Sequence, residues 1–515
     1  MKKKIANVFF ISIVLSVLFI AWGVVAPKSL ASVTSMIQTF LQDRFGWFYL
    51  FSATGFLIFS LYLVFSPYGK IKLGKDDDQP EYSRISWFAM LFSAGMGIGL
   101  VFWGVAEPLS HYHIPPVGEG QTPEAARMAM RYSFFHWGLH PWGTYSVLAL
   151  ALAYFNFRKK TPGLISHIFY PLLKEKVNGP IGKVIDVIAV FATVFGVATS
   201  LGFGAAQIGG GISYLTSIDN NFTTQLIIIV VVTCLFLLSA VTGLSKGIQY
   251  LSNLNILLAL LLLLFLLFAG PTKFLMNLLI STIGGYLQNL PAMSFYMAPF
   301  QPEANDWVQN WTVFYWAWWI AWAPFVGTFI ARVSKGRTVR EFIIGVLLVP
   351  TTFCAIWFAV FGGAGLHLDI NQGLPLFETM NDKGTEVVLF DVLQQYPLGL
   401  VMTVLAVLLI ATFFITSADS ATFVLGMQTT NGSLNPPNRV KYIWGFIISS
   451  SAAVLLYSGG LEALQTTSII ASFPFIFILF GVIVSLMKSF QQERSAAVKV
   501  KYTDQLETSA KNAEL

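Results

Sequence analysis

The sequence has little charge and almost no cysteine. Only 11% of its 515 residues are Asp, Glu, Lys or Arg, whereas about a quarter are charged in an average soluble protein. So long a chain with so few charges cannot present an ordinary water-facing surface, which excludes a typical soluble protein. Cys234 and Cys354 both lie inside apolar runs, so no disulfide framework is indicated. Phosphate-binding loops and zinc-ligand spacings are also absent, which favours ion-coupled transport over ATP-driven transport by this chain.

Long apolar runs dominate what is present. Each is long enough to cross a bilayer core of about 30 Å. They occupy approximately residues 7–26, 46–66, 87–106, 133–155, 183–211, 223–243, 250–269, 308–331, 341–364, 398–427, 440–458 and 462–486. The first run follows three lysines and has the look of a signal peptide, but no small-x-small cleavage site follows it. The pattern predicts an all-α polytopic membrane protein with twelve transmembrane helices.

The positions of the basic residues predict the orientation. The net charge of +6 could attract nucleic acid or an anionic surface, but the basic residues lie in short loops between apolar runs, so we expect no nucleic-acid partner. All but six of the 31 lysines and arginines fall on one side of the predicted topology; the exceptions are Lys28, Arg44, Arg127, Arg131, Lys273 and Lys383. The positive-inside rule makes the basic side cytoplasmic and places both termini there.

Two segments do not fit a transmembrane span. Residues 271–295 have apolar side chains at helical spacing, interrupted by Asn277 and Gln288, so we expect an amphipathic helix on the external face. Residues 487–515 form a cytoplasmic tail, and from Gln491 onward its mixed charges predict partial disorder.

Two predicted spans contain helix-weakening residues at corresponding positions. The third carries three glycines in the stretch Ser93–Gly99, each costing about 1 kcal/mol of helix propensity relative to alanine. The eighth carries Pro324 within Ala323–Gly327, where a backbone donor is lost. Interrupted helices at matching positions indicate an inverted repeat and a binding site near the midplane, whereas close packing through small residues is the alternative explanation.

This correspondence divides the chain. Residues 1–70 would hold two N-terminal transmembrane helices outside the repeats. Residues 87–270 would form the first five-helix repeat and residues 308–486 the second, separated by the amphipathic helix.

Aromatic residues gather in the fourth and eighth spans. Six of the fourteen tryptophans lie between Trp307 and Trp322, and helical geometry places Tyr315, Trp318, Trp319 and Trp322 within about 100° of one face. The fourth span adds a second group in the segment around Trp137–Tyr145. Interfacial belts explain many tryptophans, but these lie well inside a span. An aromatic box attracts a cation that donates no hydrogen bonds, such as a quaternary ammonium; an aromatic packing core is the alternative.

Other polar residues within the spans give weaker signals. His136 and His140 are four residues apart, but no carboxylate follows at a matching spacing, so hydrogen bonds to neighbouring helices are favoured over a metal site. Asp419 lies in the tenth span, where a charge is functional by default, or it orients the preceding Thr416-Ser417 pair. That hydroxyl pair suits a hard cation such as Na⁺.

Four motifs together resemble one transporter family over nearly the whole chain. They are Gly95-Met96-Gly97-Ile98-Gly99, His136-Trp137-Gly138-Leu139-His140-Pro141-Trp142, the run from Phe314 to Gly327, and Phe413-Phe414-Ile415-Thr416-Ser417-Ala418-Asp419-Ser420. The chain resembles the betaine/carnitine/choline transporter family, most closely its bacterial glycine betaine carriers. The resemblance implies a leucine-transporter-type fold with two inverted five-helix repeats, a homotrimer, and alternating access.

The resemblance also implies the site residues. Trp137, Trp142, Tyr145, Trp319 and Trp322 would line the ammonium cage, with Trp318 close by. A sodium ion would be held by carbonyls of Ser93, Met96 and Phe413 and by the hydroxyls of Thr416 and Ser417. The family's second proposed sodium site matches at Thr193 and Phe325, but Val197 stands where a second threonine is expected, so that site and a stoichiometry of two are in doubt.

One position bears on the substrate. Choline-selective family members tend to have aspartate where this chain has Gly99. Its absence favours a zwitterion such as glycine betaine, whose carboxylate can meet backbone amides freed around Gly95, Gly97 and Gly99.

The sequence therefore predicts an importer of glycine betaine or a similar compatible solute in the cell membrane, used for osmoprotection. Its coupling ion would be Na⁺, and no other cofactor is expected. The alternatives are a carnitine/betaine-type substrate:product exchanger, proton-coupled choline uptake and, from another class, a multi-span membrane enzyme with His136 or His140 as base. No nucleophile or metal set accompanies those histidines in the sequence, which argues against the enzyme.

Overall fold

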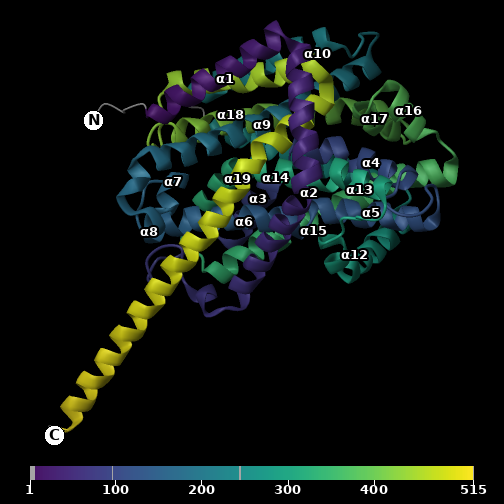
Figure 1. Ribbon diagram of the computed structural model, residues 1–515. Coiled ribbons are helices and arrows are strands. Elements are labelled where there is room, and N and C mark those ends of the chain that lie inside the picture. The colour runs from purple at the N-terminus through teal and green to yellow at the C-terminus, as the bar shows by residue number, and fades with distance from the viewer. Residues whose placement is uncertain (1–5, 96, 243–244, 514–515) are drawn as a thin grey trace.

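The fold is a bundle of helices (Figure 1). The computed structural model describes residues 6–95, 97–242 and 245–513, with side chains described outside 92–96, 240–249 and 496–513. Within these ranges the only β-type pairing is an isolated bridge between Lys72 and Thr338. The all-α prediction is thus confirmed for the described residues.

The helical elements follow one another with short connections. The N-terminal half contains α1 (Asn7–Val25), α2 (Pro27–Phe65), η1 (Pro67–Lys70), α3 (Arg84–Gly95), α4 (Ile98–His113), α5 (Pro123–Trp137), α6 (Leu139–Ala153), η2 (Tyr154–Arg158), α7 (Ile165–Ile168), α8 (Tyr170–Leu173), η3 (Lys174–Asn178), α9 (Pro180–Leu215), α10 (Phe222–Thr242) and α11 (Ser245–Ala269). The C-terminal half contains α12 (Thr272–Ser294), α13 (Pro302–Val308), η4 (Gln309–Val313), α14 (Phe314–Arg332), α15 (Val339–Gln372), α16 (Leu376–Lys383), η5 (Thr385–Val387), α17 (Val388–Gln394), α18 (Gly399–Gln428) and α19 (Asn438–Ala513).

Nine helices among the described residues are long and apolar enough to cross a membrane, so the chain is a multi-pass membrane protein. The count differs from twelve for a local reason. The third and fourth predicted spans are each divided into shorter helices, whereas α19 contains both of the last two predicted spans, joined at a kink where Gly460 has a φ of 62°. The twelve spans and the two-repeat division stay predictions.

The predicted interruption of the third span is present. Helix α3 ends at Gly95 and α4 begins at Ile98, with Gly97 as an extended N-cap. Met96 lies outside the described residues.

The predicted interruption at Pro324 is wrong. Helix α14 runs through Pro324 without a break, and the Thr328 hydroxyl donates to the Pro324 carbonyl oxygen over 2.7 Å. One missing backbone donor can be tolerated in a buried helix whose neighbours hold its shape. The local irregularity instead precedes α14, in the π-helical turn η4.

The fourth predicted span breaks at Gly138, which the sequence analysis did not foresee. A Cβ at this position would lie 2.4 Å from the Phe134 carbonyl oxygen and 2.7 Å from Tyr286 Oη, so only glycine fits. The freed backbone N–H of Leu139 donates to Tyr286 Oη over 3.1 Å. A side chain from α12 thus satisfies the break between α5 and α6.

The two segments outside the predicted spans are both helical. Helix α12 buries Leu275 and Tyr286 and exposes Ile280 and Leu287; the segment is helical, and its amphipathic character at the external face stays a prediction. The partial disorder expected for the tail is wrong as far as Ala513, because α19 continues to that residue. No glycine or proline follows Gly481 to end the helix.

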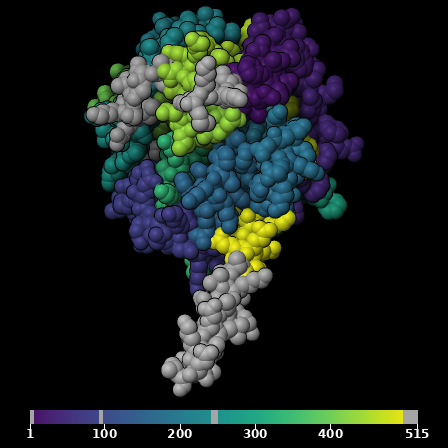
Figure 2. Space-filling model, turned by 90° about the vertical axis from the view of Figure 1, so that its left-hand side faces the viewer, coloured from purple at the N-terminus to yellow at the C-terminus, as the bar shows by residue number. Residues whose placement is uncertain are grey.

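The end of the membrane-crossing part of α19 is tied to the bundle. Glu493 accepts hydrogen bonds from Tyr154 and Arg158 and forms an ion pair with Lys159 over 3.1 Å. Arg158 also pairs with Asp76 over 2.9 Å. Beyond this point α19 projects away from the body (Figure 1), and Figure 2 shows its yellow surface emerging below the blue segment that precedes α9.

Candidate functional site

Six aromatic residues from α5, α6 and α14 meet in the interior. They form the aromatic cluster, which consists of Trp137, Trp142, Tyr145, Trp318, Trp319 and Trp322. At its centre, the ring of Trp137 lies edge-on to Trp319, with centroids 5.0 Å apart, and edge-on to Trp318 at 6.1 Å. Trp318 and Trp319 stack at 5.7 Å. The structure thus brings together the residues that the sequence analysis assigned to the cage.

The remaining members extend the aromatic cluster in two directions. Tyr145 lies edge-on to Trp319 at 5.7 Å and to Trp142 at 5.4 Å. Trp322 lies 6.5 Å from Trp318 and edge-on to Phe325 at 5.4 Å. Five of the six are buried and Trp322 is partly buried.

Polar atoms of the aromatic cluster fall into two groups. Trp137 donates to Glu107, Trp319 donates to the His136 carbonyl and Trp322 to the Gly196 carbonyl. These bonds fix the rings. In contrast, Trp142 Nε1, Tyr145 Oη and Trp318 Nε1 are buried and have no hydrogen-bond partner among the described residues. Buried donors are normally paired, so these three are available to a polar group of a ligand.

The glycine break borders the aromatic cluster. A Cβ built on Gly99 would lie 2.3 Å from Trp318 Cη2 and 3.1 Å from Trp137 Cη2. The absence of a side chain at this position therefore lets two indoles approach the α4 backbone. Gly97 has nothing within 4 Å of a built Cβ, and the side-chain surroundings of residue 95 lie outside the described set.

A charged residue missed by the sequence analysis lies behind the aromatic cluster. Glu107 of α4 is fully buried, and its carboxylate contacts four side chains: His111, His136, Trp137 and Tyr315. These five residues form the Glu107 cluster. The signal was available, because Glu107 and His111 are four apart just after the third apolar run, which the sequence analysis ended at residue 106.

The Glu107 cluster includes a combination that can bind metals. Glu107, His111 and His136 bring one ligand atom each to within 4.8 Å of one another, so a carboxylate does accompany His136, although it comes from another helix. Both carboxylate oxygens are already engaged by protein donors. Hydrogen bonds within the Glu107 cluster therefore account for the short distances among Glu107, His111 and His136, and no metal ion is needed to explain them.

The histidines bond to neighbouring helices, as expected. His136 contacts Glu107 at 2.7 Å and Thr312 at 3.0 Å. His140 contacts Ser294 at 3.1 Å and Thr54 at 3.4 Å. These contacts confirm hydrogen bonding as the role of both side chains in the fold.

The residues predicted for the sodium site are partly described. Thr416 and Ser417 lie on the continuous helix α18, and Thr416 Oγ1 donates within its own helix, to Thr412 O at 3.0 Å and Phe413 O at 3.2 Å. Met96 and the side chain of Ser93 lie outside the described residues. The site as a whole stays a prediction.

Asn255 on α11 was not foreseen beside Thr416. Its Nδ2 donates to Thr416 Oγ1 over 3.0 Å, and its Oδ1 is buried with no partner within the described ranges. The signal was a pair of amides, Asn253 and Asn255, within a largely apolar span. Asp419, two residues beyond Ser417, accepts a hydrogen bond from Ser239 on α10 over 3.1 Å.

The second sodium site gains no further ligand. Thr193 is buried and its hydroxyl donates to the Ala189 carbonyl over 2.8 Å. Val197 is also buried and offers no oxygen. Phe325 lies on α14, which packs against α9, so the elements are adjacent although the hydroxyl set is incomplete.

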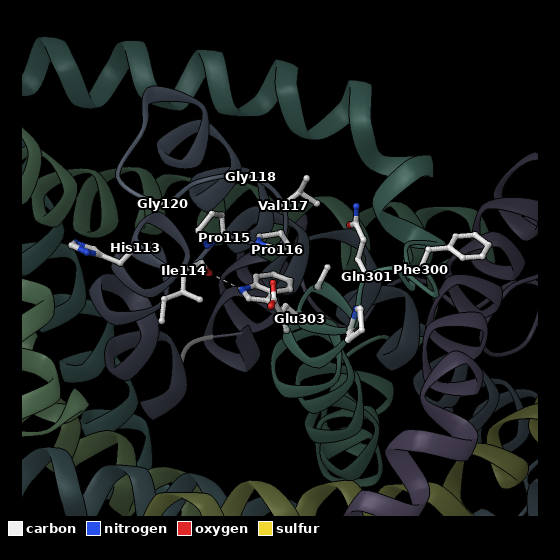
Figure 3. Close-up of a pocket in the computed structure, with 13 residues that line it drawn as sticks. His113, Ile114, Pro115, Pro116, Val117, Gly118, Gly120, Phe300, Gln301 and Glu303 are labelled. Atoms are coloured by element: carbon white, nitrogen blue, oxygen red, sulfur yellow. Dashed lines mark hydrogen bonds between the residues drawn. The ribbon is translucent and has the colours of Figure 1, made fainter.

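A cavity of about 760 Å³ opens near the end of α4. Figure 3 shows that it lies between the loop following His113 and the segment from Phe300 to Trp307. Trp307 donates to the Ile114 carbonyl over 2.9 Å, and its ring contacts His111 at 4.7 Å. Trp307 therefore separates this cavity from the Glu107 cluster.

Comparisons with known proteins agree with these features. Residues 7–495 match the betaine/carnitine/choline family transporter domain. The chain is 56% identical over 505 residues to the glycine betaine transporter OpuD of Bacillus subtilis, covering 98% of both chains. It is 47% identical to a probable glycine betaine transporter of Desulfitobacterium hafniense, covering 95% of this chain and 98% of the relative. It is 42% identical to an ectoine/hydroxyectoine transporter of Virgibacillus pantothenticus, covering 96% and 99%.

Proposed function

Because the chain belongs to the betaine/carnitine/choline transporter family, and is thus a transporter rather than an enzyme, we propose that it imports glycine betaine or a similar zwitterionic quaternary ammonium. The observation that carries this proposal is the aromatic cluster. Its six rings come from α5, α6 and α14 and are in mutual contact inside the bundle. Aromatic faces attract a trimethylammonium group by about 0.5–2 kcal/mol each.

The three unpaired donors favour a zwitterion over a bare cation. Trp142 Nε1, Tyr145 Oη and Trp318 Nε1 are buried, and each can donate to a carboxylate. Such charge-assisted bonds are about twice as strong as neutral ones. A quaternary monocation without a carboxylate would leave these donors unsatisfied, as they are in the free protein, and would gain none of these bonds.

Sodium coupling forms part of the proposal. The Thr416 and Ser417 hydroxyls and the carbonyl groups at the end of α3 are suited to a hard cation. Sodium would fix α4 relative to α18, and the assembled site would bind substrate more tightly. By linkage the substrate would raise sodium affinity by the same factor.

We also propose a homotrimer in the cell membrane, operating by alternating access, with both termini cytoplasmic and a role in osmoprotection. The family resemblance supports the trimer and the two inverted repeats. The loop distribution of lysine and arginine supports the orientation.

Uptake of radiolabelled glycine betaine into proteoliposomes tests the proposal. Accumulation should require an inward sodium gradient and stop when K⁺ replaces Na⁺. Exchange against preloaded betaine without any sodium dependence would instead identify a substrate:product exchanger. Saturation at micromolar choline but not glycine betaine would contradict the proposed substrate, and saturation by ectoine alone would contradict the quaternary ammonium.

A further inference from the structure

Glu107 on α4 forms hydrogen bonds with residues of two other helices, α5 and α14, which carry members of the aromatic cluster. Its Oε2 accepts hydrogen bonds from Trp137 Nε1 at 2.9 Å and Tyr315 Oη at 2.6 Å. Its Oε1 lies 2.7 Å from His136 Nδ1 and 3.2 Å from His111 Nε2. The carboxylate therefore connects α4, α5 and α14, the last two of which carry most of the aromatic cluster.

The contacts are consistent with a carboxylate that has no cationic partner. His136 can donate from Nδ1 to Glu107 while its Nε2 accepts from Thr312 Oγ1 at 3.0 Å. His111 can donate from Nε2, and its Nδ1 has no partner in the part of the chain that the structure describes. Both neutral tautomers satisfy the observed geometry, and the ion pairs of Glu107 within the described chain involve only these two histidines. Four donors stabilise the charge but do not neutralise it.

The charge lies directly behind the ammonium-binding surface. Trp137 bonds to Glu107 through Nε1 and presents its ring to Trp318 and Trp319. Tyr315, on the same oxygen, lies edge-on to Trp137 at 5.7 Å. A cation within the aromatic cluster would thus lie about one indole from a buried negative charge, where the field is weakly screened.

We propose that Glu107 is a positioning residue of the aromatic cluster that also supplies the buried negative charge opposite a bound quaternary ammonium. It acts through Trp137 and Tyr315: it fixes both rings by their polar atoms, and its charge attracts the cation through the Trp137 ring. This inference rests on the proposed function of the aromatic cluster as the substrate site.

The test compares Glu107→Gln with the full-length wild type in nanodiscs. Tryptophan fluorescence would measure the dissociation constants of glycine betaine and of tetramethylammonium, a cation without a carboxylate. Glu107→Gln removes the charge. Each carboxylate oxygen faces two donors, so the new NH₂ group would face two donors in either orientation of the amide. Both dissociation constants should rise about tenfold, with tetramethylammonium affected at least as much as betaine. In uptake assays the change should appear in KM more than in Vmax.

Two further variants separate the charge from folding. Glu107→Asp keeps the charge and should recover part of the lost affinity for tetramethylammonium. Tyr315→Phe keeps the charge and the ring but removes one hydrogen bond, and should raise KM about threefold even if Glu107→Gln does not fold.

Asp186→Asn is the matched control, because Asp186 is a buried carboxylate that accepts two hydrogen bonds from Ser166. The dissociation constants of this variant should equal those of the wild type.

The outcomes distinguish this inference from the proposed function. If the wild type binds neither compound, the proposed function fails. If the wild type binds both and a folded Glu107→Gln protein binds them with unchanged constants, only the role of Glu107 fails. An unchanged KM in Tyr315→Phe would overturn the positioning role. If Glu107→Asp loses as much tetramethylammonium affinity as Glu107→Gln, the role of the charge is overturned.

Discussion

At the scale of single residues, Gly99 sets how closely two indoles approach the α4 backbone. Replacing Gly99 by alanine would place a methyl group 2.3 Å from Trp318 Cη2, so Trp318 would have to move within the aromatic cluster. We expect glycine betaine affinity to fall about tenfold or more, since overpacking typically costs about 1–3 kcal/mol. Fluorescence titration measures the change.

The matched control is Gly55→Ala on α2, where a built Cβ has nothing within 4 Å. Its dissociation constant should be that of the wild type. Equal affinities in both variants would show that Trp318 does not define the site.

The Tyr145 hydroxyl provides a test of carboxylate recognition. Its oxygen is buried and has no partner among the residues that the structure describes, so Tyr145→Phe should cost the free protein little stability. If the hydroxyl donates to the substrate carboxylate, glycine betaine affinity should fall about tenfold, since a bond to a charged group contributes about 1.5–3 kcal/mol. Tetramethylammonium affinity should be unchanged in the same titration, and equal losses for both compounds would contradict this role.

The residue scale also shows what sequence reasoning could reach. Helical spacing and depth within a span predicted an aromatic box from the fourth and eighth spans, with Tyr315 among its members. The family resemblance supplied the six residues of the aromatic cluster. Glu107 was missed because the third apolar run was ended at residue 106, although His111 follows it by four residues. Its other partners, His136, Trp137 and Tyr315, come from two other helices. Spacing along one chain segment cannot reveal a cluster assembled by packing between helices.

At the scale of elements, glycine and proline had unequal predictive value. The break between α3 and α4 followed from glycine propensity. Pro324 left α14 intact, whereas a single glycine at 138 divided the fourth span. The difference is tertiary: Gly138 is crowded by Tyr286 of α12, a contact that propensity does not contain.

The Tyr286 contact therefore predicts a stability effect. Tyr286→Phe removes the acceptor of the Leu139 N–H and leaves a partly buried donor unsatisfied. We expect unfolding to become easier by about 1–3 kcal/mol, seen as a lower Tm in a thermal unfolding assay of the purified protein. Tyr296→Phe is the control, because the Tyr296 hydroxyl is buried without a partner and its removal should leave Tm nearly unchanged; similar Tm losses in both would argue against the α12 contact.

At the scale of the whole molecule, the proposed sodium and substrate sites are joined through α4. The helix begins at Ile98, two residues after the predicted sodium ligand Met96 in the sequence, and carries Gly99 and Glu107 toward the aromatic cluster. An ion that fixes the start of α4 would therefore also fix two of its contacts with the substrate site. This arrangement predicts coupling between the two ligands rather than independent binding.

Thr416→Val tests that coupling because it removes a hydroxyl while keeping the side-chain shape. In the wild type, saturating Na⁺ should lower the betaine dissociation constant, and saturating betaine should lower that of Na⁺ by the same factor. A factor of about 5–150 corresponds to the 1–3 kcal/mol typical of such coupling. In Thr416→Val both factors should approach one, while betaine affinity without sodium stays at its wild-type value, since Thr416 is not a member of the aromatic cluster. Loss of sodium-free betaine binding would instead mean that Thr416 supports the substrate site directly, through its contact with Asn255.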